Sequence, residues 1–385
     1  MIERNKRDAV IVEAVRTPIG KRGRGLAGVR PDELAALVLS ALVKRSGVEP
    51  LEVDDVIVGC ATPIGEQGWN VGRMAALHAG FPPEVPAVTI NRMCASSDQA
   101  AAFAAQAVRA GDADMVIAAG VESMSRIEMG SDGRKPNPAL MEKYSLVPQG
   151  ISAEMMAEKY KLSREALDEY SLESHARAVE SLDAGDFKRE TIAVPTGTNG
   201  SASRLSADEG PRRDTSPEAL AGLKPAFKEY GKITAGNSSQ MSDGAAGLLI
   251  VSREKAESLG LTPRGRLIAS ASVGSDPVLQ LEGPIPATAK ALKKAGLRAE
   301  DIHLFEVNEA FASVVLPWLQ AYPAARGKLN RRGGAIALGH PLGATGARLI
   351  VTLLHELEER GGGIGLSTMC IGHGMANATV IEVPG

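Results

Sequence analysis

The 385-residue chain contains an internal repeat, and this repeat constrains its fold more than any other feature. Residues 31–60 read as a helix, a glycine, an acidic pair and an apolar strand, and residues 284–310 repeat that order. Farther along each half, a helix rich in small residues is followed by another strand, over residues 95–120 and 341–370. Because successive elements recur in the same order, we expect two related halves, each a strand–helix–strand–helix–strand unit.

The predicted strands are short runs of Val, Ile and Ala that are mostly apolar throughout and do not alternate with polar residues. Such runs are typical of strands covered by helices on both faces, which indicates the α/β class. The runs are Ala9–Val15, Val56–Val58, Met115–Ala119, Leu248–Val251, Leu267–Ser270, Ile302–Val307 and Ile364–Thr368.

A polar region, residues 123–241, separates the two halves. It is rich in Met, Ser, Arg and Glu, and it contains a charged helix predicted over Ser163–Gly185. We interpret it as a domain inserted in the first half, suited to act as a lid or a cofactor platform. The first half then comprises residues 1–122 and 242–266, and the second half comprises residues 267–385.

The composition and the cysteines exclude several classes of protein. Aromatic residues make up only 3% of the chain whereas glycine numbers 42, so the core must be built from small and aliphatic side chains. A net charge of −3 argues against a general nucleic-acid-binding protein. Three scattered cysteines are not a disulfide framework, and no His/Cys spacing suggests a metal site. The first apolar run is too short for a signal peptide or a membrane span, so we expect a cytoplasmic protein.

Two residues at the start of the small-residue helices could form a nucleophile and its base. Cys94 follows an apparent strand and precedes the helix predicted over Ala95–Ala110, where the helix dipole would favour a thiolate. His340 occupies the matching position in the second half, before Pro341. If the two helices pack closely, Cys94 and His340 meet, and a Cys–His pair is a standard way to activate a thiol. The alternatives are a buried structural cysteine and an ordinary structural histidine.

Other strand ends supply polar groups to the same edge of the sheet. Cys370 ends a predicted strand, and Gly372 in the following turn allows a backbone N–H to approach a ligand closely. Asn308 ends another strand, and ligands gather beyond the carboxyl ends of strands in α/β sheets. Helix capping is the alternative for Asn308. Cys60 lacks such a setting and is predicted to be structural, and Arg24 lies in a predicted solvated loop.

Five stretches of the chain resemble the motifs of a known family. The stretches NRMCASS, NEAFA, GGAIALGHPLGATGARL, STMCIGHGM and TAGNSSQMSDGAA together closely resemble the thiolases, in family order across the whole chain. The resemblance implies two βαβαβαββ halves in a five-layered α/β/α/β/α core, with an inserted loop domain that binds coenzyme A. It also implies a homodimer or homotetramer and an acyltransferase that acts on coenzyme A and 3-ketoacyl-CoA. No tightly bound cofactor, nucleic acid or membrane is implied.

The resemblance also implies roles for individual residues. Cys94 matches the cysteine that becomes acylated, His340 the base that activates it, and Cys370 a second cysteine that shuttles a proton. Asn308 matches the asparagine that holds a water beside His340.

Three further positions match groups that bind the substrate. Gly372, with Cys94, matches the backbone N–H groups of a second oxyanion hole. Ser239 matches a serine near the pantetheine of coenzyme A, and Arg212 matches an arginine near its nucleotide.

Two departures from the short-chain biosynthetic thiolases bear on the substrate. Residues 147–150 read Val-Pro-Gln-Gly where those enzymes usually carry Met-His-Met-Gly, and residues 237–240 read Asn-Ser-Ser-Gln in place of Asn-Ala-Ser-Gly. Both differences resemble the degradative 3-ketoacyl-CoA thiolases, such as those of β-oxidation in fatty acid metabolism. The alternatives are a biosynthetic acetoacetyl-CoA thiolase and, less favoured, a catalytically idle acyl-CoA or lipid carrier. Cys370 disfavours a decarboxylating condensing enzyme, and the role of His373 stays open.

Overall fold

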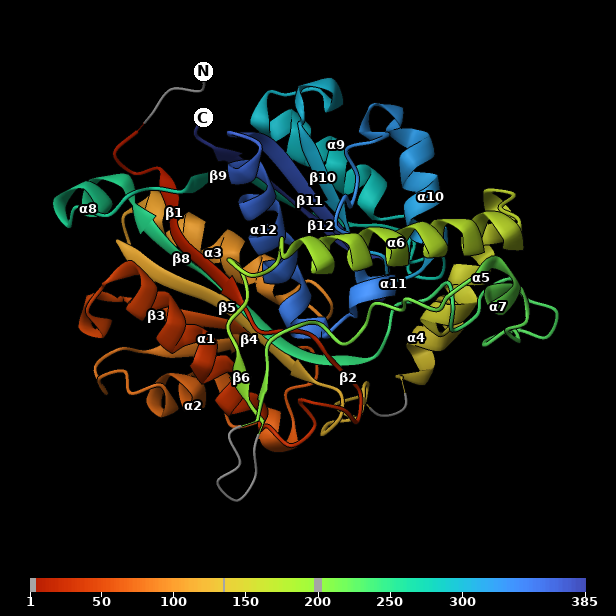
Figure 1. Cartoon of the computed structure of the whole chain (residues 1–385), viewed down its shortest axis with the longest axis horizontal. Helices are drawn as coiled ribbons and strands as arrows, with labels where there is room; N and C mark the ends of the chain where they lie inside the picture. The colour runs from red at the N-terminus through yellow and green to blue at the C-terminus, as the bar shows by residue number, and fades with distance from the viewer. Residues whose placement is uncertain (1–4, 134–135, 197–202) are drawn as a thin grey trace.

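The computed structural model describes residues 5–133, 136–196 and 203–385 (Figure 1). The strands of the first half lie in the order β4-β3-β5-β8-β1, with β1 antiparallel to β8 and β3 parallel to both β4 and β5. They span β1 Ala9–Arg16, β3 Asp55–Gly59, β4 Ala87–Ile90, β5 Met115–Ser123 and β8 Ser242–Ser252, and the short β2 Gly20–Lys21 pairs with β8. The helices of this half are α1 Pro31–Ser46, α2 Val71–His78, α3 Ser96–Ala110 and α8 Arg253–Ser258.

The second half repeats this arrangement in the order β10-β11-β12-β9. Its strands are β9 Gly265–Gly274, β10 Leu304–Val307, β11 Gly363–Ile371 and β12 Met375–Val383. Its helices are α9 Pro284–Ala295, α10 Ala312–Ala321, α11 Ala335–Leu338 and α12 Leu342–Glu359. The two halves join where Val10 and Ile11 of β1 pair with the first two residues of β9. The predicted α/β repeat is confirmed.

The repeat is incomplete at one place. The segment before Cys94 contains β4, but the matching segment before His340 forms a turn and the short helix α11. At the position in the second half that corresponds to β4, Phe305 and Leu329 form an isolated parallel bridge in place of a strand. His340 therefore follows the short helix α11 and not a strand.

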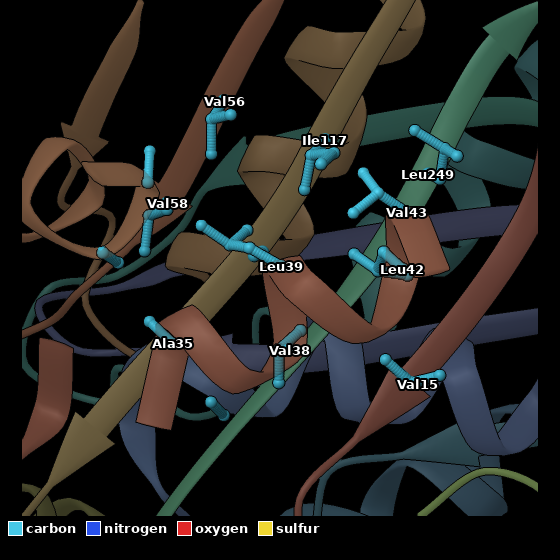
Figure 2. Close-up of a cluster of buried hydrophobic side chains, with 14 of the residues drawn as sticks. Val15, Ala35, Val38, Leu39, Leu42, Val43, Val56, Val58, Ile117 and Leu249 are labelled. Atoms are coloured by element: carbon cyan, nitrogen blue, oxygen red, sulfur yellow. The ribbon is translucent and has the colours of Figure 1, made fainter. Parts of the chain in front are cut away.

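Five layers result from this pairing, as the thiolase resemblance implied. Along β1, Val10 and Val12 belong to the core beneath α1, whereas Ala9 and Ile11 pack on the opposite face with residues of α3 and α12. Helices α9 and α10 cover the outer face of the second half, so α3 and α12 lie between the two halves of the 10-stranded sheet (Figure 1). Figure 2 shows α1 side chains such as Leu39 and Leu42 against strand residues such as Ile117.

Small residues allow the two central helices to approach closely, as the composition predicted. A Cβ atom added at Gly346 of α12 would lie 2.3 Å from the backbone nitrogen of Asp98 in α3. A Cβ atom at Gly343 would lie 2.5 Å from the carbonyl oxygen of Val121. No larger residue fits at either position without moving the backbone, so Gly346 sets how closely α12 approaches α3 and Gly343 sets how closely it approaches β5.

The insert lies over the second half and consists mainly of helices. They are α4 Pro138–Lys143, α5 Gln149–Lys159, α6 Arg164–Ala184 and α7 Pro217–Ala221, and two short strands, β6 Val194–Pro195 and β7 Arg204–Leu205, pair with each other. Helix α6 has the predicted ends, because the Ser163 hydroxyl accepts a hydrogen bond from the Ala166 N–H and Gly185 adopts the left-handed conformation. Within residues 5–133, 136–196 and 203–385, no helix is both long and apolar enough to cross a membrane.

Candidate active site

Cys94 lies in a tight turn between β4 and α3. Met93 adopts a left-handed backbone conformation with φ of 49°, which turns the chain sharply. The Ser96 hydroxyl closes the turn, since it accepts a hydrogen bond from the Arg92 N–H at 2.9 Å and donates one to the Met93 carbonyl at 2.6 Å. The turn places Cys94 just before α3, with 5% of its surface exposed.

The N–H groups of Cys94 itself and of Gly372, together with the side-chain amide of Gln149, are within hydrogen-bonding reach of the Cys94 sulfur. Burial, together with the buried carboxylate of Glu122, nevertheless raises the pKa of the Cys94 thiol to about 12 against the three donors. The helix position therefore does not by itself yield a thiolate, because desolvation of the charged form outweighs it. The thiol must lose its proton to a base within the site.

Cys370 and Gly372 lie beside Cys94. Burial, and the proximity of Cys94, raise the pKa of the Cys370 thiol. A Cβ atom at Gly372 would lie 2.8 Å from the Met93 sulfur and 3.4 Å from Nε2 of Gln149, so the absence of a side chain lets this turn approach Cys94. The side chain of His373 is exposed on the surface of the single chain.

His340 lies buried at the end of the loop that precedes α12. The Thr345 hydroxyl donates a hydrogen bond to the Pro341 carbonyl at 2.8 Å, so it accepts one from Nδ1–H of His340 at 2.7 Å. This pairing leaves the lone pair on Nε2, which lies 3.3 Å from Nδ2 of Asn308. Burial lowers the pKa of His340 to about 3, and the positive charge of Arg348 adds to this effect. His340 is therefore a neutral imidazole whose Nε2 carries the lone pair, accepts a hydrogen bond from the Asn308 amide and can take a proton.

The structure brings Asn308 to His340 and does not use it as a helix cap. Its backbone N–H donates to the Thr368 carbonyl on β11, two residues before Cys370, and α10 begins later, after Phe311. The side-chain oxygen of Asn308 is buried and has no hydrogen-bond partner among the described residues. An unpartnered buried acceptor beside a base is suited to accept a hydrogen bond from a water molecule.

Two contacts connect the Cys94 group with the His340 group. Leu342, two residues after His340, packs against the apolar cluster that contains Cys94 and Met369. The Glu122 carboxylate accepts hydrogen bonds at 2.8 Å from the N–H groups of Gly343 in α12 and Ala61 after β3. These contacts fix the start of α12, and with it His340, relative to the loops around Cys94.

The predicted coenzyme A residues lie on the insert side of the site. The Ser239 N–H donates to the Ala310 carbonyl at 2.9 Å, and the next residue, Gln240, accepts from the His340 N–H at 3.0 Å. The Gln240 side chain also donates to the Gly210 carbonyl, close to Arg212. The segment around Ser239 thus connects Arg212 with the His340 loop.

A cavity of about 190 Å³ opens beside Arg212, lined also by His175, Gln240 and Leu223. Sequence reasoning missed two cations here. Burial and the proximity of Arg212 and then Arg24 lower the pKa of Lys21, against the opposite effect of the Glu209 and Asp214 carboxylates. Three positive and two negative side chains therefore lie near one another at this end of the insert. Arg24 was expected in a solvated loop, and only the pairing of β2 with β8 brings this loop to Arg212.

Comparison with known proteins identifies the family. Residues 9–254 match the family described as "Thiolase, N-terminal domain", and residues 261–383 match "Thiolase, C-terminal domain". The chain belongs to the thiolase family. Its membership confirms the fold, the acyltransferase class and the resemblance on which the residue assignments rest.

Thiolase relatives match along the full length. A steroid 3-ketoacyl-CoA thiolase of Mycobacterium tuberculosis is 46% identical, over 97% of this chain and 94% of that protein. A 3-ketoacyl-CoA thiolase of Bacillus subtilis is 44% identical, over 98% of this chain and 100% of that protein. The crystal structure of the Bacillus anthracis acetyl-CoA acetyltransferase superimposes with a TM-score of 0.91 at 40% identity, over 98% of both chains.

Proposed function

We propose that this thiolase cleaves 3-ketoacyl-CoA with coenzyme A, through an acyl group held on Cys94. The observation that carries the proposal is the arrangement around the Cys94 sulfur, where the Gly372 N–H and Cys370 lie close by and Leu342, two residues after His340, packs against the same cluster. A nucleophile, a neutral base and a second thiol are the groups that this reaction requires.

In the first half-reaction, Nε2 of His340 takes the Cys94 proton and the thiolate attacks the 3-keto carbon. The backbone N–H groups of Cys94 and Gly372 hold the oxyanion, and each such donor is typically worth about 3 kcal/mol. The bond between C2 and C3 then breaks, and its electron pair forms the enolate of acetyl-CoA, which His340 and a water held by Asn308 stabilise. Cys370 donates its proton to C2, so acetyl-CoA leaves and the acyl group stays on Cys94.

In the second half-reaction, the Cys370 thiolate takes the proton from the thiol of an incoming coenzyme A. The resulting thiolate attacks the acyl carbon, and the Cys94 sulfur departs with the electron pair and regains its proton from His340. Both cysteines end as thiols, and the reverse sequence is a Claisen condensation.

We propose that coenzyme A enters across the insert. Lys21, Arg24 and Arg212 would bind its phosphates, and Ser239 would contact the pantetheine arm that leads to Cys94. Two exposed apolar side chains of the insert, Leu223 and Phe227, lie between Arg212 and Ser239 in the sequence and would cover this arm. Phe227 also contacts Gly150 and stacks edge-on against Phe311, which positions it over the site.

The substrate preference is expected to favour 3-ketoacyl chains longer than acetoacetyl-CoA, because Gln149 stands where short-chain enzymes carry a methionine. We expect kcat/KM for CoA-dependent cleavage to be about tenfold or more higher for 3-ketohexanoyl-CoA or longer and branched chains, since each added methylene can contribute that much in an apolar pocket. A strict preference for acetoacetyl-CoA would favour the biosynthetic alternative, and no cleavage of any chain length would favour the idle carrier.

We also propose the domain boundaries given by the sequence and a cytoplasmic location. The boundary proposed between residues 266 and 267 falls within β9, whose first two residues pair with β1 of the first half and whose residues from Arg266 on pair with β12 of the second. The three cysteines are free and buried, which suits a reducing compartment that cell fractionation can test.

We propose that two copies of this chain associate through β4 and that two such dimers form a homotetramer. Strand β4 ends the sheet order of the first half, and Val88 on it is 41% exposed. Exposed apolar residues flank it on α2 and just before it, namely Trp69, Met74 and Leu77. An apolar sheet edge of this kind pairs readily with a second copy.

Replacing Val88 by lysine is therefore expected to reduce the assembly to monomers, because a buried unpaired charge opposes the pairing. Light scattering after gel filtration measures the mass. Leu51→Lys, at an exposed leucine outside this face, should leave the mass unchanged. A monomeric wild-type protein would rule out the proposed interface.

A further inference from the structure

Gln149 presents its side-chain amide to the reacting sulfur. It is the first residue of α5, so the inserted domain, and not either core half, delivers this group. Its Nε2 lies 3.4 Å from the position that a Cβ atom of Gly372 would occupy, and the amide is near enough to the Cys94 sulfur to act as a donor to it. The amide therefore sits between the nucleophile and the turn that supplies the Gly372 N–H.

Gln280 ties together the two loops that carry these donors. Its side-chain amide donates to the Val147 carbonyl at 2.7 Å, just before α5, and its side-chain oxygen accepts from the His373 N–H at 2.9 Å. Gln280 is buried, and it holds a left-handed backbone conformation with φ of 49° that is unfavourable for a residue with a Cβ atom. One side chain thus sets the spacing between the Gln149 loop and the Gly372 turn.

We propose that Gln149 is a further catalytic residue, a third N–H donor to the Cys94 sulfur, and that Gln280 is the positioning residue that holds Gln149 and Gly372 around it. The catalytic role given to Gln149 rests on the proposed function. The contacts themselves do not depend on it.

The chemistry of both half-reactions gives this donor a purpose. The sulfur carries negative charge twice, when His340 removes its proton and when coenzyme A expels it from the thioester. A donor to a charged sulfur in a buried site is stronger than one in water, and here it offsets part of the cost of burial. The pKa of the Cys94 thiol agrees with this role, because the Gln149 amide lowers that pKa whereas burial raises it.

The test compares Gln149→Met, which keeps the length of the side chain but removes the donor, with Gln149→Glu, which replaces the donor by a negative charge. We expect Gln149→Met to lower kcat of thiolysis about 10- to 100-fold while KM for coenzyme A changes less than about twofold. Gln149→Glu should lower kcat further. The control is Gln320→Met, at an exposed glutamine of α10, which should behave as wild type.

A second measurement needs no substrate. The rate of iodoacetamide alkylation at Cys94, followed by mass spectrometry as a function of pH, should be displaced to higher pH in Gln149→Met. A kcat within twofold of wild type with an unchanged alkylation profile would overturn the role of Gln149. Failure of the wild type to form an acyl-enzyme would overturn the proposed function instead, and the alkylation profile would still test Gln149.

For Gln280, the expected signature is a smaller change in the same two quantities. Gln280→Met removes both of its bonds, whereas Gln280→Glu keeps the acceptor for the His373 N–H and should recover part of kcat. Unchanged kcat and alkylation in Gln280→Met would overturn its positioning role. Thermal unfolding by circular dichroism identifies any variant that has lost its fold, and for such a variant Gln280→Glu supplies the comparison.

Discussion

Cys94→Ala is expected to abolish acyl transfer, with a fall in kcat of at least about 10⁴-fold. The other groups of the site can polarise a carbonyl, but they cannot hold the acyl group between the departure of acetyl-CoA and the arrival of coenzyme A. Intact-protein mass spectrometry after mixing with a 3-ketoacyl-CoA should show the added acyl mass on the wild type and none on the variant. A labelled acyl group that still attached to Cys94→Ala would contradict the assignment.

Cys60→Ala provides the matched control, because Cys60 is a free and fully buried thiol on the same sheet edge. The Cys60→Ala variant should still form the acyl-enzyme.

The Cys94 thiol of the wild-type protein should show a particular pH dependence of alkylation. Burial raises the pKa of Cys94 to about 12, so the thiolate fraction, and with it the alkylation rate, should rise about tenfold per pH unit up to at least pH 9. A plateau near pH 7 would indicate a preformed ion pair.

His340→Ala is expected to lower kcat about 10²- to 10⁴-fold, the range for loss of a positioned general base. Without Nε2, the Cys94 proton has no acceptor, and the enolate loses one of its partners. Single-turnover acylation measures the first effect directly and should slow by a similar factor. Acylation at the wild-type rate would show that another group removes the proton.

The pH dependence of His340 and its hydrogen bond to Thr345 sharpen this test. Because burial lowers the pKa of His340 to about 3, the imidazole stays neutral as the pH falls from 8 to 5, and acylation should not show a His titration near pH 6.5 in that range. Thr345→Val keeps the shape of the side chain but removes the acceptor for Nδ1–H. It should slow acylation less than His340→Ala, by about tenfold, because the ring stays in place with a less defined tautomer.

The structure alters the sequence-based description of Cys94 in one respect. Its position before α3 predicted a thiolate, because the dipole and free N–H groups at a helix start are local features. The surrounding elements bury the sulfur almost completely, and removing water from a charge costs more than a few donors return. The position of the nucleophile was predictable, whereas its protonation state depends on how many segments cover it.

The sequence alone determined the two-half α/β architecture, the inserted domain and the candidates Cys94, His340, Cys370 and Asn308. These follow from periodicity, from strand and helix ends, and from motifs, all of which are patterns along the chain. Only the tertiary structure brought Gln149, Gln280 and the Lys21 loop to the site, and only it showed that α11 replaces a strand before His340. Each of these features depends on contacts between segments that are far apart in the sequence. The geometry of those contacts is fixed only when the two central helices pack closely and the insert covers the site.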